Sequence, residues 1–196
     1  IRKCFASRKD LVENHEIIEE FINGAIACIR VTNDCSSIKK CHLVLEAASE
    51  NMDIKVKLFT TIKANCEKTP LFLTNTSSIP ISELVSKTGL TGQIIGYHFY
   101  NPPQKQKLVE LVIPSNSSAE IKETAEVITK LLRKTTIPSS DVAGFIGNGH
   151  FMREFLQADK MVGNDHSIIP DIDGITRDLL IRPMGIFQLI DYVGLD

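Results

Sequence analysis

Short apolar runs alternate with longer amphipathic segments up to about residue 140, and this alternation constrains the fold more than any other feature. Helical spacing of apolar residues predicts helices over residues 10–21, 52–66 and 119–133. The apolar runs predict strands over residues 25–31, 43–45, 71–73, 94–100 and 108–113. Strands that alternate with helices in this way are typical of an α/β fold with a mostly parallel sheet.

The strand pattern stops near Ala143, and the rest of the chain has only helical periodicity. We expect helices over residues 145–162, 170–180 and 184–193. A boundary at the polar residues Ser139, Ser140 and Asp141 would divide the chain into a sheet domain over residues 1–140 and an all-helical domain over residues 141–196.

The composition excludes several classes of function. The net charge is −2 with both signs interspersed, so we expect no nucleic-acid surface. No apolar run approaches the ~20 residues of a membrane span. The five cysteines contain no CxxC pair and the five histidines lack metal-ligand spacing, which favours reduced thiols and predicts no metal site.

The chain opens at Ile1 with a polar, basic segment that lacks the apolar core of a secretory signal. We expect a chain that was processed, cut by design or begun inside a larger protein. Reduced cysteines predict a reducing compartment, either the cytoplasm or the mitochondrial matrix.

His98 stands late in a predicted strand, and Glu110 stands in the next one. A lone histidine on a strand is more often a packing or surface residue, and a lone acid is usually solvated. The catalytic interpretation is stronger for the two residues together, because both fall at predicted strand ends on one side of the sheet. A carboxylate beside an imidazole makes a base that works near neutral pH, so we expect His98 and Glu110 to form a catalytic pair. Phe99 and Tyr100 are interpreted as packing residues.

Further polar residues follow the predicted strands, where α/β sheets bind their ligands. They are Glu46, Glu50, the run from Asn75 to Ser78, and Asn148 at the start of a predicted helix. Each also has an ordinary structural interpretation as a turn or a cap. Lys55, on the following helix, is as well explained by a solvated face as by a ligand contact. The GxGxxG, P-loop, GxSxG and HExxH motifs are absent, and the glycines at 144, 147 and 149 lie at a helix start.

Together these residues resemble the L-3-hydroxyacyl-CoA dehydrogenase family. The similar segments keep the family's order and spacing from about Leu43 to the last residue. They are residues 43–50 with Lys55, 75–79, 96–102, 107–110, 144–146 with Asn148, 183–185 and 191–196. The resemblance implies a Rossmann-like sheet without its first βα unit, followed by an all-helical domain that packs between subunits of a homodimer.

The resemblance also implies an activity, the NAD-dependent oxidation of the 3-hydroxyl of an L-3-hydroxyacyl-CoA to a 3-ketoacyl-CoA, as in fatty-acid β-oxidation. His98 would be the general base, oriented by Glu110. Ser77 and Asn148 would hydrogen-bond the reacting oxygen or the thioester carbonyl of the substrate. The residues implied along the cofactor are Glu50, Lys55, Asn75 and Ser77. The basic start, including Arg8 and Lys9, would meet the CoA phosphates; this similarity is loose, and an ordinary solvated face is the alternative interpretation.

Some family features are missing from the sequence. The resemblance places Ile1 after the family's glycine-rich turn and its ribose-binding acid, and Asp196 before its last helices. We therefore expect the chain as it stands to bind NAD weakly or not at all. His150 follows Gly149 where members carry arginine, Ala143 replaces a proline and Gln106 replaces a methionine. Two alternatives remain: a hydroxy-acid dehydrogenase without CoA, similar to gulonate 3-dehydrogenases, and a non-catalytic binding or structural homologue.

Overall fold

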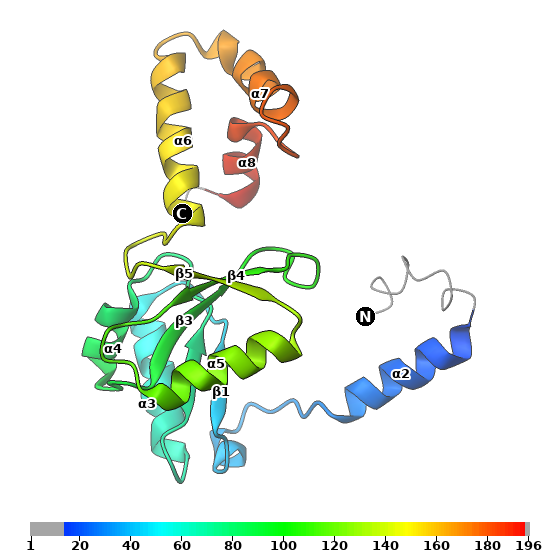
Figure 1. Cartoon of the computed structure of the whole chain (residues 1–196), viewed down its shortest axis with the longest axis vertical. Coiled ribbons are helices and arrows are strands. Elements are labelled where there is room, and N and C mark those ends of the chain that lie inside the picture. Colours follow the sequence, from blue (N-terminus) through cyan, green and yellow to red (C-terminus); the bar gives the residue numbers. More distant parts are fainter. Residues whose placement is uncertain (1–13, 195–196) are drawn as a thin grey trace.

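The computed structural model describes residues 14–194 and shows a five-stranded sheet followed by a group of helices (Figure 1). The strands lie side by side in chain order, as β1 (Leu43–Glu46), β2 (Leu71–Thr74), β3 (Ile94–Phe99), β4 (Leu108–Val112) and β5 (Thr135–Ser139). All neighbours are parallel except β3 and β4, which are antiparallel. The prediction of an α/β fold with a mostly parallel sheet is confirmed.

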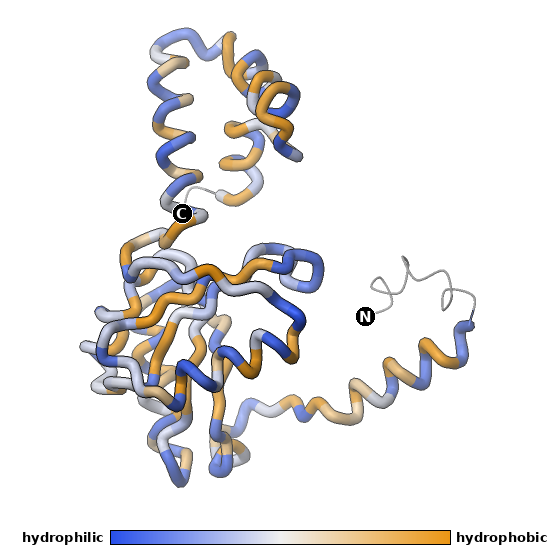
Figure 2. Tube along the Cα trace, viewed as in Figure 1, coloured by the Kyte–Doolittle hydropathy of each residue, from blue (hydrophilic) through white to orange (hydrophobic). Residues whose placement is uncertain are grey.

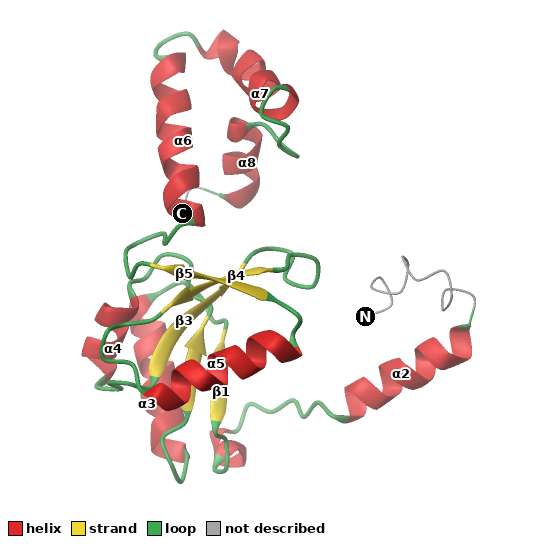
Figure 3. Ribbon diagram, viewed as in Figure 1, coloured by secondary structure: helices red, strands yellow, loops and turns green. Residues whose placement is uncertain are grey.

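Helices cover both faces of the sheet because alternate strand residues point to opposite sides (Figure 3). Phe72 and Ile94 pack against α3 (Met52–Asn65) and α4 (Ile81–Thr88). Leu73 and Ile95 pack on the other face against α5 (Ala119–Leu131). In Figure 2 the central strands are mostly apolar, which agrees with strands that are buried on both faces.

The predicted strand over residues 25–31 is wrong. The helix α2 (His15–Ala27) continues through Gly24, and no strand follows it before β1. The apolar residues that follow this helix are exposed to solvent, with Ile29 64% and Val31 92% accessible. They have no described strand beside them to complete a ladder, so β-branched composition alone does not produce a strand here. Residues 10–13 of the predicted first helix lie outside the described residues.

Two elements were not predicted, the helix α4 and the strand β5. The first backbone amides of α4 donate to the Asp141 carboxylate, from Ile81 at 2.6 Å and from Ser82 at 2.8 Å. Asp141 is sixty residues away along the chain, so no local signal could reveal this cap. The strand β5 contains Pro138 and is mostly exposed, as expected of an edge strand that the alternation rule misses.

Three helices follow the sheet, α6 (Gly147–Val162), α7 (Ile169–Asp178) and α8 (Ile186–Val193), with a short 3₁₀ turn at His166–Ile168. The three predicted helices are therefore present, each with slightly different ends. Asp173 of α7 accepts the backbone amides of Phe187 at 2.8 Å and Gln188 at 3.2 Å, which caps α8. Gly185 is required beside it, because a Cβ there would lie 2.3 Å from the Asp173 carboxyl carbon.

No helix in the described part of the chain is long and apolar enough to span a bilayer.

We predict that Asp141→Ala lowers the free energy of unfolding by about 1–2 kcal/mol, because α4 would lose its N-terminal acceptor. Denaturant unfolding followed by circular dichroism would measure the change. Ser140→Ala, at the exposed neighbouring position, is the control and should change stability by less than about 0.5 kcal/mol. Equal effects of the two substitutions would contradict the assigned cap.

Candidate active site

The carboxyl ends of the parallel strands bring the polar residues of the site to one edge of the sheet. Glu46, Thr74 and Gly96 stand in register across β1, β2 and β3. Glu50 follows β1, and the run from Asn75 to Ser78 follows β2. Parallel strands end at a common edge, so residues that are distant in sequence become neighbours there.

His98 and Glu110 are directly opposite each other on β3 and β4. Opposed residues leave a sheet on the same side, so the register alone brings the two side chains together. His98 Nδ1 lies 2.6 Å from Glu110 Oε2, and both residues are buried, with exposed fractions of 6% and 1%. The imidazole is thus held by one ring nitrogen, and its ring borders a cavity.

The second oxygen of Glu110 binds the start of α6. Glu110 Oε1 accepts the backbone amides of Ile146 at 2.9 Å and Gly147 at 2.8 Å. Burial would raise the pKa of Glu110, but hydrogen bonds from His98, Gly147 and Tyr100 keep it below its ordinary value. The carboxylate therefore stays charged at neutral pH, where it can stabilise a positive charge on His98.

Glu50 organises the turn after β2. Its Oε1 accepts the hydroxyl of Thr76 at 2.5 Å, the backbone amides of Ser77 and Ser78 at 2.9 Å each, and the Ser78 hydroxyl at 2.9 Å. Partial burial opposes ionisation of Glu50, but these donors lower its pKa to about 2. The turn that presents Ser77 is consequently built around one carboxylate.

Lys55 lies beneath this turn and is 1% exposed. Its ammonium contacts Glu46 Oε1 at 2.7 Å and Glu50 Oε2 at 3.4 Å. Thr74 donates to the other oxygen of Glu46 at 2.5 Å. Lys55 therefore links the end of β1 to Glu50, and its charge is directed at protein carboxylates.

Asn75 and Asn148 connect the turn to its surroundings. Asn75 Oδ1 accepts the backbone amide of Phe99 at 2.8 Å, which ties the end of β2 to the end of β3. Asn148 Nδ2, in the first turn of α6, donates to the backbone carbonyl of Ser77 at 3.3 Å. The Ser77 hydroxyl makes no hydrogen bond to any other described residue and borders the cavity. Arg8 and Lys9 lie outside the described residues.

Two adjoining cavities separate the sheet edge from α6 and α8. One, of about 700 Å³, is lined by His98, Ser77 and Asn148 together with Leu189 and Tyr192 of α8. The other, of about 550 Å³, shares Ser77 and Asn148 and adds Glu50. The structure thus brings His98, Ser77, Asn148 and Glu50 to two adjoining cavities. Glu110 and Lys55 line neither cavity, but Glu110 contacts His98 and Lys55 contacts Glu50.

Sequence reasoning missed Tyr100, which was interpreted as a packing residue. Its ring centroid lies 5.3 Å from that of His98, and its hydroxyl hydrogen-bonds Glu110. Burial and the Glu110 charge raise the pKa of Tyr100 to about 12, so it remains a donor. Gly147 permits this approach, because a Cβ there would lie 2.3 Å from the Tyr100 oxygen. The available signal was position, since Tyr100 is two residues beyond His98 and alternate strand residues share a side.

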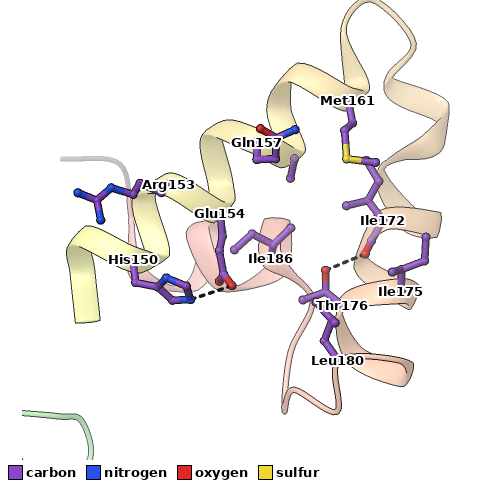
Figure 4. Close-up of a pocket in the computed structure, with 11 residues that line it drawn as sticks. His150, Arg153, Glu154, Gln157, Met161, Ile172, Ile175, Thr176, Leu180 and Ile186 are labelled. Carbon is purple, nitrogen blue, oxygen red and sulfur yellow. Dashed lines mark hydrogen bonds and ion pairs between the residues drawn. The ribbon is translucent and has the colours of Figure 1, made fainter. Parts of the chain in front are cut away.

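A separate hollow of about 360 Å³ lies within the helical group, between α6, α7 and α8 (Figure 4). Its lining is largely apolar and includes Met161, Ile172 and Leu180. At one end, His150 Nε2 lies 3.1 Å from Glu154, which also pairs with Arg182 at 2.5 Å. Within residues 14–194, no group of three or more histidine, cysteine or acidic residues could hold a metal ion.

Comparison with protein families matches nearly the whole chain. The family model described as 3-hydroxyacyl-CoA dehydrogenase, NAD binding domain, matches residues 1–142. The model described as 3-hydroxyacyl-CoA dehydrogenase, C-terminal domain, matches residues 144–196. The chain belongs to the 3-hydroxyacyl-CoA dehydrogenase family. The match begins at residue 1, earlier than Leu43, where the motifs of the resemblance begin.

Relatives of this family cover the chain at moderate identity. The mitochondrial hydroxyacyl-coenzyme A dehydrogenase of Sus scrofa is 31% identical over 191 residues, which are 97% of this chain and 61% of the relative. A probable 3-hydroxybutyryl-CoA dehydrogenase of Deinococcus radiodurans is 35% identical over 171 residues, 86% of this chain and 60% of the relative. The chain therefore spans about three fifths of the length of these curated relatives.

Solved structures of the family have the same fold. The (S)-3-hydroxybutyryl-CoA dehydrogenase of Ralstonia eutropha superposes with a TM-score of 0.84 at 29% identity, covering 97% of this chain and 67% of that one. FadB2 of M. tuberculosis superposes with a TM-score of 0.83 at 29% identity, covering 100% of this chain and 70% of that one. The Rossmann-like architecture of the sheet is thereby established.

We predict that Glu50→Gln lowers the free energy of unfolding at pH 7 by about 1–2 kcal/mol, after allowance for solvent screening. The folded-state pKa is depressed, so the ionised carboxylate stabilises the fold above its ordinary value of 4.5, and this contribution is lost as the pH falls towards about 2. Urea titrations at several pH values should show the two proteins converging in acid. Glu126→Gln, on the exposed side of α5, is the control. A difference in unfolding free energy between the two proteins that does not change with pH would contradict the lowered pKa of Glu50.

We predict that Tyr100→Phe lowers kcat/KM for L-3-hydroxybutyryl-CoA by about three- to tenfold. Tyr100 is one of the groups that keep the pKa of Glu110 below its ordinary value, and the substitution removes it. Tyr192→Phe is the matched control, because Tyr192 lines the same cavity and is 78% exposed. An unchanged kcat/KM in Tyr100→Phe would contradict a functional role for the tyrosine beside Glu110.

Proposed function

We propose that this protein is an NAD-dependent 3-hydroxyacyl-CoA dehydrogenase, which oxidises the 3-hydroxyl of an L-3-hydroxyacyl-CoA to a 3-ketoacyl-CoA. One observation carries the proposal, the 2.6 Å contact between His98 and a buried Glu110 beside an open cavity. Family membership supports the substrate class, because the relatives above are named for this reaction. The place of this reaction would be fatty-acid metabolism.

The proton step follows from the geometry of the pair. Glu110 holds His98 through Nδ1, which leaves Nε2 to accept the proton of a substrate hydroxyl in the cavity. The imidazole becomes positively charged as it accepts this proton, and the ionised Glu110 stabilises that charge. The α6 amides restrain the carboxylate, so little reorganisation accompanies the transfer.

Ser77 and Asn148 are proposed to hold the substrate oxygens. Both line the same cavity as His98, and the Ser77 hydroxyl has a free donor to offer. Hydrogen bonds to the reacting oxygen and the thioester carbonyl would fix the hydroxyl against the imidazole. We also propose that Arg8 and Lys9 contact the CoA phosphates, which the implied family site and their positive charges support.

The described residues fit the nicotinamide and ribose end of NAD. The cavity lined by Glu50 and Ser77 adjoins the one lined by His98, at the carboxyl ends of parallel strands. Bound NAD would supply the hydride acceptor. Glu50 and Ser77 would contact it, while Lys55 and Asn75 would position those two groups through the ion pair to Glu50 and the bond to Phe99.

We further propose two partial domains, a dinucleotide-binding domain over residues 1–140 and a substrate and dimerisation domain over residues 141–196. Exposed apolar residues on the helical part support a homodimer through these helices, among them Leu156, Leu179 and Ile181. A reducing compartment, the cytoplasm or the mitochondrial matrix, is proposed from the unpaired described cysteines. Sedimentation equilibrium should give twice the chain mass for the protein, and a monomer at micromolar concentration would contradict the dimer.

We predict that His98→Gln lowers kcat/KM for L-3-hydroxybutyryl-CoA by about 10²–10⁴-fold, because glutamine cannot accept the hydroxyl proton. NADH affinity, measured by calorimetry, should change by less than about twofold. His42→Gln, at an exposed position before β1, should retain full activity. Turnover that survives in His98→Gln would refute the base assignment.

An assay of NADH formation at saturating NAD, run on the full-length protein, decides the substrate class. We expect turnover with L-3-hydroxybutyryl-CoA and none with gulonate. Turnover with gulonate alone would identify a hydroxy-acid dehydrogenase, and no turnover with either compound, despite bound NAD, would support a non-catalytic homologue.

A further inference from the structure

Two cysteines meet at the amino ends of the strands, at the sheet edge opposite the candidate active site. Cys41 precedes β1, and Cys66 ends α3 just before β2. The Cys41 backbone amide and the Cys66 thiol donate to the same atom, the carbonyl oxygen of Ile38, at 2.8 Å and 3.3 Å. A further bond, from the Glu67 amide to the Lys39 carbonyl at 2.9 Å, fixes the two segments against each other. The two segments that carry Cys41 and Cys66 are thus held side by side, with the Cys66 thiol and the Cys41 backbone on one carbonyl.

Both thiols are accessible and free to react. Cys41 and Cys66 are each partly exposed, and each Sγ makes only a weak hydrogen bond to a backbone carbonyl. Burial raises the pKa of Cys66, and the nearby thiols of Cys41 and Cys35 raise it further. The raised pKa disfavours the Cys66 thiolate, which suits a thiol that acts second.

A basic cavity of about 350 Å³ adjoins Cys41. The charged and titratable residues that line it, besides the thiol, are three lysines, one histidine and one acid: Lys39, Lys40, Lys68, His42 and Glu67. The local charge is positive although the chain has a net charge of −2. Such a cavity concentrates anions beside the thiol.

We propose that Cys41 and Cys66 form a dithiol redox site that reacts with an anionic low-molecular-weight disulfide of the glutathione class. The Cys41 thiolate attacks one sulfur of the disulfide, the S–S bond breaks, and one glutathione thiolate leaves and takes up the proton that Cys41 released. The Cys66 thiolate then attacks the Cys41 sulfur of the mixed disulfide. The second glutathione leaves with the proton from Cys66, and a Cys41–Cys66 disulfide remains. Two protein thiols are oxidised and one glutathione disulfide is reduced to two thiols.

The cross-link would stabilise the first part of the sheet. It closes a loop that contains β1 and all of α3, the two elements that hold Glu46, Glu50 and Lys55. Constraining this loop in the unfolded chain should raise the midpoint of thermal unfolding by about 10 °C relative to the reduced protein. The site does not depend on the proposed dehydrogenase activity.

Peptide mapping by mass spectrometry tests the proposal. The reduced full chain is incubated with glutathione disulfide, quenched with acid and alkylated. We expect one linked peptide pair, Cys41 with Cys66, that is two hydrogen atoms lighter than the reduced pair and carries no glutathione. In Cys66→Ser, one glutathionyl group should remain on Cys41. A disulfide between any other pair, or glutathione retained on Cys41 in the wild type, would overturn the proposal.

A second measurement isolates the basic cavity. Replacing Lys39, Lys40 and Lys68 together by glutamine should slow the reaction of Cys41 with glutathione disulfide by about tenfold or more. The reaction with neutral hydroxyethyl disulfide should keep its rate, as should the reaction of the exposed Cys28 with either compound. Equal slowing with both disulfides, or no slowing with glutathione disulfide, would show that the lysines do not recruit the anion.

Discussion

The buried carboxylate of Glu110 is the interaction on which the rest of the site depends. One oxygen binds His98 and the other binds the first amides of α6, so one side chain joins the sheet, the imidazole and the helical group. A buried charge is tolerated only when its acceptors are satisfied, and here His98, the helix start and Tyr100 satisfy them. Losing any of these donors would loosen the hold on His98 as well as the junction between sheet and helices.

A second carboxylate, Glu50, plays the matching role on the other side of the cavity. Glu50 accepts a backbone amide of the turn after β2. Lys55 forms a buried ion pair with Glu46 and also contacts Glu50. This chain thus uses two ionised acids, each held by backbone amides, to position His98 and a polar turn at one edge of the sheet. Both acids keep a pKa below the ordinary value despite burial, so both remain charged at neutral pH.

The features of the fold that depend on nearby residues in the sequence could be predicted from the sequence. The alternation of apolar runs and helical spacing predicted β1 to β4 and the helices α3 and α5, and the order of His98 and Glu110 on adjacent strands indicated their pairing. What remained hidden depends on contacts between distant residues. The cap of α4 comes from Asp141, and Tyr100 matters only because Gly147 of another element leaves room for its hydroxyl. The strand expected over residues 25–31 failed for the converse reason, since no described strand lies beside it.

The most direct test of the account is a double-mutant cycle on His98 and Glu110, measured as kcat/KM for oxidation of L-3-hydroxybutyryl-CoA. Glutamine at position 110 keeps an oxygen for the α6 amides but removes the charge that acts on the imidazole. If Glu110 works through His98, the protein with both residues changed to glutamine should be no slower than His98→Gln alone. Losses that simply multiply would contradict the account, because they would mean that the two side chains act independently.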